Sequence, residues 1–193
     1  RKFIYLYCDS LLVAVASASD STIFSLHALF DSDPELVAGD LTHDAADVAS
    51  GVLVAVKYSA TKTETVDCIG LQVNANGYAK VSVYNDNGAG TAPTGLPLAK
   101  QDTSSQCLVH NENYIMLESA CLMTIGEVYW LVFIIDTAGT TRRTAATGIG
   151  TAKYKNAVAY AGYSAGDLTG YAWTGDWSYG ISISANAYAF TGL

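Results

Sequence analysis

The sequence predicts an all-β protein, an antiparallel two-sheet β-sandwich of jelly-roll-like type with an N-terminal extension. Short apolar runs recur at intervals of roughly ten to twenty residues, and Gly, Asn and Asp turn signals separate them. One run, Glu127–Ile135 (EVYWLVFII), is apolar on both faces, as in a central strand covered on each side. Another segment, Val81–Lys100 (VSVYNDNGAGTAPTGLPLAK), leads from a strand through a Gly/Pro-rich loop into a second strand.

The sandwich is expected over residues 50–193, where turn signals separate all the apolar segments. The expected strands are Val52–Tyr58, Val66–Val73, Ala79–Tyr84, Leu96–Ala99, Tyr114–Leu117, Val128–Ile135, Ala157–Tyr163 and Tyr179–Ala187. Alternation is clear in the last of them, where Ile181 and Ile183 share one face and Ser182 and Ser184 the other. This pattern is typical of a strand with one side against a core.

Residues 1–49 are expected to form an extension of the sandwich. The first 18 residues imitate a signal peptide, but Asp9-Ser10 interrupts the apolar run, and the stretch is too short to span a bilayer. Two strands, Phe3–Tyr7 and Leu11–Ala16, fit it better. Residues 22–30 fit either a short helix or a strand, because periodicity cannot separate the two over so few residues.

The net charge and the content of charged residues argue against some classes of binding partner. The net charge is -8 and the pI is about 4.6, which argues against binding nucleic acid or anionic lipid through a general field. Only 15% of the residues are charged, well below the usual quarter. Such a surface suits secreted β-proteins and the subunits of assemblies, and it also fits a small domain with a polar but uncharged surface.

Val81–Lys100 resembles a signature of a jelly-roll β-sandwich found in bacteriophage tail and capsid-surface proteins and in secreted bacterial proteins. In that pattern a strand ends in Tyr84, a turn and a Pro loop follow, and the segment closes on Leu98-Ala99. A later Gly-x-x-Tyr-Trp-Leu segment is matched by Gly126–Leu131, and an aromatic, Gly-rich closing segment by Tyr163–Ala185. The resemblance covers roughly residues 50–190 and implies a fold that serves as scaffold, decoration or glycan-binding module.

An enzyme is not expected. Gly162–Gly166 is a literal G-x-S-x-G, the motif that exposes a nucleophilic serine in α/β-hydrolases. That mechanism needs a histidine after the serine, whereas His27, His43 and His110 all precede Ser164. The histidines also lack the spacing of a zinc site. A Gly/Ser turn of a β-protein explains the motif better.

The aromatic tail of the chain is the main candidate for binding a partner or ligand. Its candidate residues are Tyr171, Trp173, Asp176, Trp177 and Tyr179. Aromatic side chains anchor protein–protein contacts and stack on sugar faces, with an acid beside them to bond hydroxyl groups. The alternative is that the tryptophans pack beneath a loop or close one end of the sandwich.

Two further features leave alternatives open. The weak Ca²⁺ candidates are Asp31, Asp33, Glu35 and Asp86, which offer hard oxygen ligands, although Asp and Asn are also ordinary turn residues. No other cofactor is expected. Cys107 and Cys121 could form a disulfide across a hairpin, or all four cysteines could be buried thiols.

The expected function is that of a non-enzymatic structural protein on a virion surface, as a phage head decoration or a tail or fibre component. Its partners would be copies of itself and other virion proteins, with surface glycans as further candidates. One alternative is a carbohydrate-binding module of a secreted or phage protein. Another is a subunit of an extracellular filament that exchanges residues 1–18 between subunits.

Overall fold

The structure is a computed structural model of the chain. It describes residues 3–8, 11–16, 34–40, 47–48, 51–73, 76–107, 112–136, 141–144, 152–177 and 180–188. The chain divides into two compact units. The first comprises Arg1–Asp31 with Thr191–Leu193, and the second comprises Ser32–Phe190.

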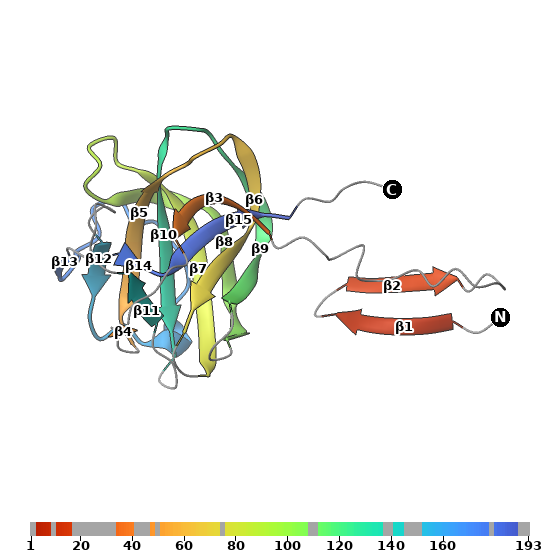
Figure 1. The fold of residues 1–193 in the computed structure, drawn as a ribbon. Helices are drawn as coiled ribbons and strands as arrows, with labels where there is room; N and C mark the ends of the chain where they lie inside the picture. Colours follow the sequence, from red (N-terminus) through yellow and green to blue (C-terminus); the bar gives the residue numbers. More distant parts are fainter. Residues whose placement is uncertain are drawn as a thin grey trace. The chain divides into compact units, whose positions relative to one another are not determined.

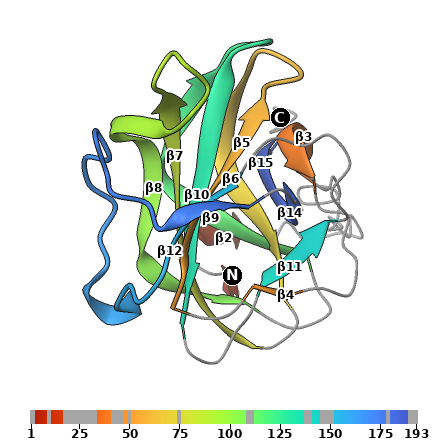
Figure 2. The same ribbon diagram turned by 90° about the vertical axis from the view of Figure 1, so that its left-hand side faces the viewer.

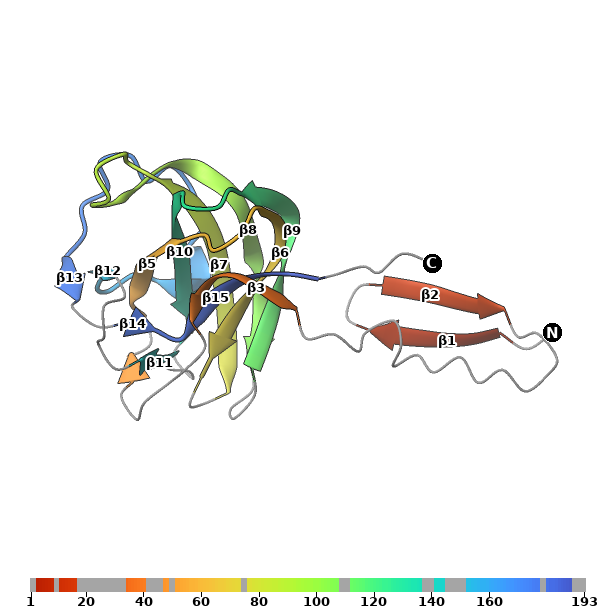
Figure 3. The same cartoon turned by 45° about the horizontal axis from the view of Figure 1, so that its top comes forward.

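The first unit contains a two-stranded antiparallel sheet. Strand β1 (Phe3–Cys8) pairs with β2 (Leu11–Ala16) in continuous register, from Phe3 opposite Ala16 to Cys8 opposite Leu11 (Figure 3). The two strands expected in this region are therefore both present, and β1 is one residue longer than predicted.

The second unit is an antiparallel two-sheet sandwich, which confirms the predicted fold class (Figure 1). One sheet has six strands in the order β13 (Gly175–Trp177), β12 (Ala152–Lys155), β5 (Leu53–Ser59), β10 (Val128–Ile135), β7 (Gly77–Asp86) and β8 (Pro93–Cys107). The other has four strands in the order β3 (Glu35–Asp40), β15 (Ile183–Ala187), β6 (Glu64–Gln72) and β9 (Glu112–Met123). A small third sheet joins β14 (Gly180–Ile181), β11 (Thr141–Thr144) and β4 (Asp47–Val48).

Strand β10 shows why the sandwich has two apolar layers. It pairs with β5 on one side and β7 on the other, so it lies inside the six-stranded sheet. Its residues alternate between the faces: Leu131 and Phe133 belong to the core between the sheets, whereas Trp130 and Val132 belong to a second apolar cluster on the opposite face. The prediction that this strand is covered on both sides is therefore correct.

Strand β3 changes the expected boundary of the sandwich. It lies within the extension predicted over residues 1–49, yet it pairs with β15 at the edge of the four-stranded sheet. Gly39, at φ 104°, makes this pairing possible, because a Cβ there would collide with the backbone of Ile183 and Ser184. No strand is predicted here from the sequence, because the segment is short and lies at a sheet edge.

Strands β8 and β9 are much longer than predicted, and one expected strand is absent. Strands β8 and β9 continue through polar residues, since an edge strand is fixed by backbone pairing with its neighbour as well as by its own hydrophobicity. The strand predicted over Ala157–Tyr163 is wrong: Ala157 has φ 56°, and a 3₁₀ turn follows at Tyr160–Gly162. Residues 22–30 lie outside the described residues.

Candidate functional site

A long irregular segment between β12 and β13 covers the outer face of the six-stranded sheet. We call this segment, Asn156–Thr174, the strap (Figure 2). Its buried residues Ala165 and Leu168 pack with Trp130 and neighbouring apolar residues of the sheet. Partly buried strap aromatics, Tyr163 among them, complete the cluster. The strap is therefore a third layer over a face that would otherwise expose apolar residues.

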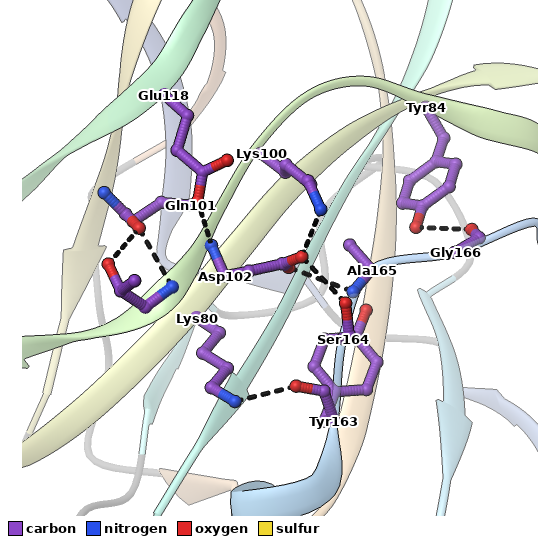
Figure 4. Close-up of polar contacts among 11 residues, drawn as sticks. Lys80, Tyr84, Lys100, Gln101, Asp102, Glu118, Tyr163, Ser164, Ala165 and Gly166 are labelled. Atoms are coloured by element: carbon purple, nitrogen blue, oxygen red, sulfur yellow. Dashed lines mark hydrogen bonds and ion pairs between the residues drawn. The ribbon is translucent and has the colours of Figure 1, made fainter.

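Strand β7 holds the strap from below. Its outward-facing residues Lys80 and Tyr84 point at strap carbonyl groups (Figure 4). The Lys80 ammonium is buried and donates to the carbonyl oxygen of Tyr163 at 2.7 Å and to that of Tyr160 at 3.3 Å. The Tyr84 hydroxyl donates to the Gly166 carbonyl at 2.9 Å. These bonds tie strap carbonyl groups to the sheet, in addition to the backbone hydrogen bonds that the strap forms within itself.

Asp102 on β8 fastens the middle of the strap (Figure 4). Its carboxylate accepts hydrogen bonds from the Ser164 hydroxyl and the Ala165 N–H, both at 2.9 Å, and pairs with the Lys100 ammonium. Burial alone would raise the pKa of Asp102, but the bonds from Lys100, Ala165 and Ser164 outweigh burial and lower the pKa. The charged carboxylate is therefore the form that holds the strap.

These contacts explain the G-x-S-x-G segment. The Ser164 hydroxyl donates a hydrogen bond to the Asp102 carboxylate, whose lowered pKa keeps it ionised. The next residue donates its N–H to the same carboxylate, and Gly166 accepts from Tyr84. The motif is therefore an anchor of the strap: Gly162 ends the 3₁₀ turn and the remaining residues are irregular, not the turn that the sequence predicted. His27, His43 and His110 lie outside the described residues.

The strap contains a depression of about 340 Å³. Its walls include the side chains of Tyr163, Tyr171 and Leu168, and its polar groups include Ser164 and Asp167. Hydrogen bonds from the backbone N–H and the side chain of Thr169 lower the pKa of Asp167. Burial raises the pKa of Tyr163 and Tyr171, so both phenols are neutral at physiological pH.

The candidate aromatic residues do not form one surface. Trp173 and Tyr171 contact each other edge to face, at 5.0 Å between ring centroids, and both pack with the outer apolar cluster. Trp177 instead packs with the core between the two sheets and stacks on Tyr154 with centroids 4.5 Å apart. The six-stranded sheet separates the two tryptophans, which therefore pack on opposite faces of it.

The remaining residues of the expected binding tail have separate surroundings. Asp176 pairs with Lys153, 2.6 Å between the charged atoms, on the adjoining strand. Tyr179 lies outside the described residues. Of the four candidates that the structure describes, Tyr171 alone lines the depression. Trp173 and Trp177 therefore pack against the apolar clusters of the sandwich, as the alternative from the sequence expected, and they do not share a binding surface.

The two Ca²⁺ candidates that the structure describes, Glu35 and Asp86, have separate partners. Asp86 accepts hydrogen bonds from Trp130 Nε1 at 2.8 Å and from the Gly90 N–H at 2.7 Å, so it holds the Gly-rich turn against the sheet. Glu35 forms an ion pair with Lys62. Asp31 and Asp33 lie outside the described residues. Within the described residues no three His, Cys, Asp or Glu side chains gather to hold a metal ion.

The cysteines that the structure describes with their surroundings are free. Cys107 and Cys121 are both buried thiols, so the disulfide considered between them is not present, and Cys68 is a buried thiol as well. Burial raises the pKa of Cys107 to about 12 and that of Cys121 to about 11. These thiols therefore serve as apolar core residues.

The residues that hold the strap, Lys80, Tyr84 and Asp102, were not among the candidates from the sequence. Part of the signal was present: Lys80, Ser82 and Tyr84 alternate with Val81 and Val83, which places polar groups on one face of β7. Nothing in the sequence shows that residues some 80 positions later cover that face. Asp102 gives no signal, because it stands in a polar stretch.

Comparisons with protein-family models, with curated proteins and with solved structures find no match to this chain. The resemblance to phage and secreted jelly-roll proteins therefore receives no support from them and stays an expectation. In the described part of the chain, no helix has the length and hydrophobicity that crossing a membrane requires. What the coordinates establish is the class of fold, an antiparallel β-sandwich with a strapped outer face.

Proposed function

We propose that this chain is a non-enzymatic structural subunit that acts through protein–protein assembly, on a virion surface as a head decoration or a tail or fibre component. The observation that carries the assembly role is the two-stranded sheet of the first unit. The virion setting rests on the resemblance of the sequence and on its low content of charged residues, 15%.

The hairpin formed by β1 and β2 is too apolar to be stable when both of its faces are exposed to water. Every residue of β1 (FIYLYC) and β2 (LLVAVA) is apolar or aromatic. Since successive residues of a strand alternate between faces, both faces of this sheet carry apolar residue types. A two-stranded hairpin is only marginally stable alone, and one that is apolar on both faces gains stability by being covered. A neighbouring subunit is the cover that the proposal assigns.

The strap supports a structural role in a second way. The polar groups that catalysis would use are occupied by internal bonds: Ser164 bonds Asp102, and Lys80 bonds two carbonyl groups. A catalytic site keeps a nucleophile and a base poised for a substrate. Here the same residue types are used to hold the chain to its own sheet.

Deletion of residues 1–18 tests the proposal. We expect the full chain to self-associate and the deleted chain to be monomeric, because the apolar hairpin provides the contact. Sedimentation velocity over a range of protein concentrations measures the association. A thermal melt of each chain, followed by circular dichroism in the β-sheet region, checks that the sandwich remains folded.

A point variant in the hairpin distinguishes the loss of its apolar contact from the effect of shortening the chain. Leu6 lies opposite Val13 in the middle of the hairpin, and Leu6→Asp places a charge there. We expect Leu6→Asp to abolish association and Ala161→Asp, an exposed position on the strap, to leave it unchanged. Association that survives both the deletion and Leu6→Asp would refute the assembly role of the hairpin. Electron micrographs of the native source then distinguish a capsid or tail location from a fibre or free monomers.

A further inference from the structure

The depression in the strap has a size and shape that suit a small ligand. Its volume of about 340 Å³ lies at the lower end of the range of roughly 300–1,000 Å³ for ligand pockets. All of the residues that line it come from the strap. The strap is fixed to the sheet at Lys80, Tyr84 and Asp102, so the depression is held in shape before any ligand binds.

Two side chains of the depression, besides the tyrosine hydroxyl groups, offer hydrogen-bond acceptors. The Ser164 hydroxyl donates its hydrogen bond to Asp102, which leaves the lone pairs of its oxygen free to accept. The Asp167 carboxylate accepts hydrogen bonds from Thr169, among them one from the Thr169 N–H at 2.8 Å, and keeps further acceptor sites. Among the residues that the structure describes, no Lys, Arg or His lines the depression. An anionic ligand would therefore meet a carboxylate without a compensating cation.

The walls of the depression are apolar and partly aromatic. Tyr163 and Tyr171 bring two aromatic rings, and Val158 and Leu168 bring aliphatic side chains. A ligand that matches this lining has an apolar C–H face and several O–H donors. A sugar ring combines both properties, since its hydroxyl groups donate at the rim while its C–H face packs on an aromatic ring.

We infer that this depression binds one ring of a neutral sugar, with the Asp167 carboxylate accepting hydrogen bonds from its hydroxyl groups and a tyrosine ring of the strap against its C–H face. This site differs from the tail surface expected from the sequence, because Trp173, Asp176 and Trp177 do not line it. The inference stands apart from the proposed assembly role: a subunit that assembles through its hairpin could carry the site or lack it.

An NMR titration of the full chain with methyl glycosides of glucose, galactose, mannose and N-acetylglucosamine tests the inference. We expect saturable shifts confined to the amides of the strap for at least one sugar, with a Kd on the order of 1 mM because the site is small and shallow. Asp167→Asn should weaken that binding about tenfold, because a charged acceptor forms the stronger hydrogen bond.

Two neighbouring substitutions provide a matched pair. A Cβ at Gly162 would meet no atom within 4 Å, so Gly162→Phe can place its ring in the depression without a collision at its first carbon. Ala161 is exposed and does not line the depression, so Ala161→Phe adds the same ring beside it. We expect Gly162→Phe to abolish the shifts and Ala161→Phe to leave them. A dispersed spectrum for each variant establishes that it is folded.

Three results would overturn the inference. The first is the absence of saturable shifts for every sugar tested. The second is binding that survives Gly162→Phe, which would place the sugar elsewhere on the molecule. The third is tighter binding of tetramethylammonium than of any sugar, since two tyrosines and a carboxylate would then be acting as a site for an organic cation.

Discussion

Asp102 illustrates how single residues hold an irregular segment in place. The strap forms some backbone hydrogen bonds of its own, and side chains of the sheet beneath it bind further strap groups. The Asp102 carboxylate provides two acceptor atoms for the strap, one for the Ser164 hydroxyl and one for the Ala165 N–H. Lys100 keeps the same carboxylate charged. One residue thus couples the edge strand β8 to the middle of the strap.

Asp102→Asn should lower the free energy of unfolding by about 1–3 kcal/mol, because it removes charge-assisted bonds and leaves the Lys100 ammonium without its partner. Urea unfolding at pH 7 measures the change. Asp176→Asn is the control: its carboxylate is more than half exposed and pairs with Lys153, so a loss below about 1 kcal/mol is expected. Equal effects of the two variants would contradict the assigned role of Asp102.

The pH dependence of the same pair gives a second prediction. The pKa of Asp102 is lower in the folded protein than its ordinary value of 3.8, so the carboxylate stabilises the fold at pH above that value. This contribution falls as the pH drops through the lowered pKa. The difference in stability between the wild type and Asp102→Asn should therefore be constant from pH 7 to about pH 5 and shrink below about pH 4. A difference that grows on acidification would show that the pKa is raised instead.

At the scale of elements, the β12–β13 pair depends on one close approach. Strand β13 has only three residues and pairs with β12 at the edge of the six-stranded sheet. The stack of Trp177 on Tyr154 fixes it there. Gly175, the register partner of Tyr154, leaves the space that this ring needs: a Cβ at position 175 would come within 3.0 Å of the Tyr154 hydroxyl oxygen and 3.1 Å of a ring carbon.

Gly175→Ala should therefore displace the Tyr154 ring and weaken its stack on Trp177. We expect a loss of about 1–3 kcal/mol in the free energy of unfolding, as for other overpacked sites. Near-ultraviolet circular dichroism follows the change at the stacked rings. Gly162→Ala is the matched control, because its added Cβ has open space and the variant should keep the wild-type spectrum and stability. An unchanged spectrum and an unchanged free energy of unfolding for Gly175→Ala would contradict the prediction, because the Tyr154 ring would then accommodate the added methyl group.

At the scale of the whole molecule, buried thiols are probes of the interior of the sandwich. Cys107 and Cys121 belong to the cluster between the two sheets, and Cys68 is fully buried on β6. Burial raises the pKa of all three thiols, with a further rise at Cys68 from the Asp67 carboxylate. Since the thiolate is the reactive form, the burial of these thiols and their protonated state both slow their reaction with thiol reagents.

We expect a Cys8→Ser variant, which removes the fourth cysteine, to show no rapidly reacting thiol at pH 8 in native buffer. In denaturant, all three remaining thiols should react together as the core opens. Ellman's reagent gives the rate, and mass spectrometry of quenched samples gives the number of labelled cysteines. One thiol that reacts rapidly in the native protein would show that its part of the core opens locally. Fewer than three thiols in denaturant would reveal a disulfide.

The parts of the fold that the sequence predicted are those whose signals are local. Val128–Ile135 was assigned with the bounds of β10, since an apolar run between turn signals needs no distant partner to be recognised. Ala157–Tyr163 was assigned wrongly for a related reason. Its apolar and aromatic residues pack on the outer face of the six-stranded sheet, and a segment that covers a sheet face carries the same residue types as a strand within a sheet.

By itself, the sequence determined the class of fold: alternation, apolar runs and turn residues act over a few positions and indicate a two-sheet sandwich. The tertiary structure alone decided the candidate site. Only the pairing of strands far apart in the chain placed Asp102 beside Ser164 and put the six-stranded sheet between Trp173 and Trp177. The physical reason is that a site is a set of distances between remote residues. Composition and periodicity specify which residues are buried, whereas packing specifies which of them meet.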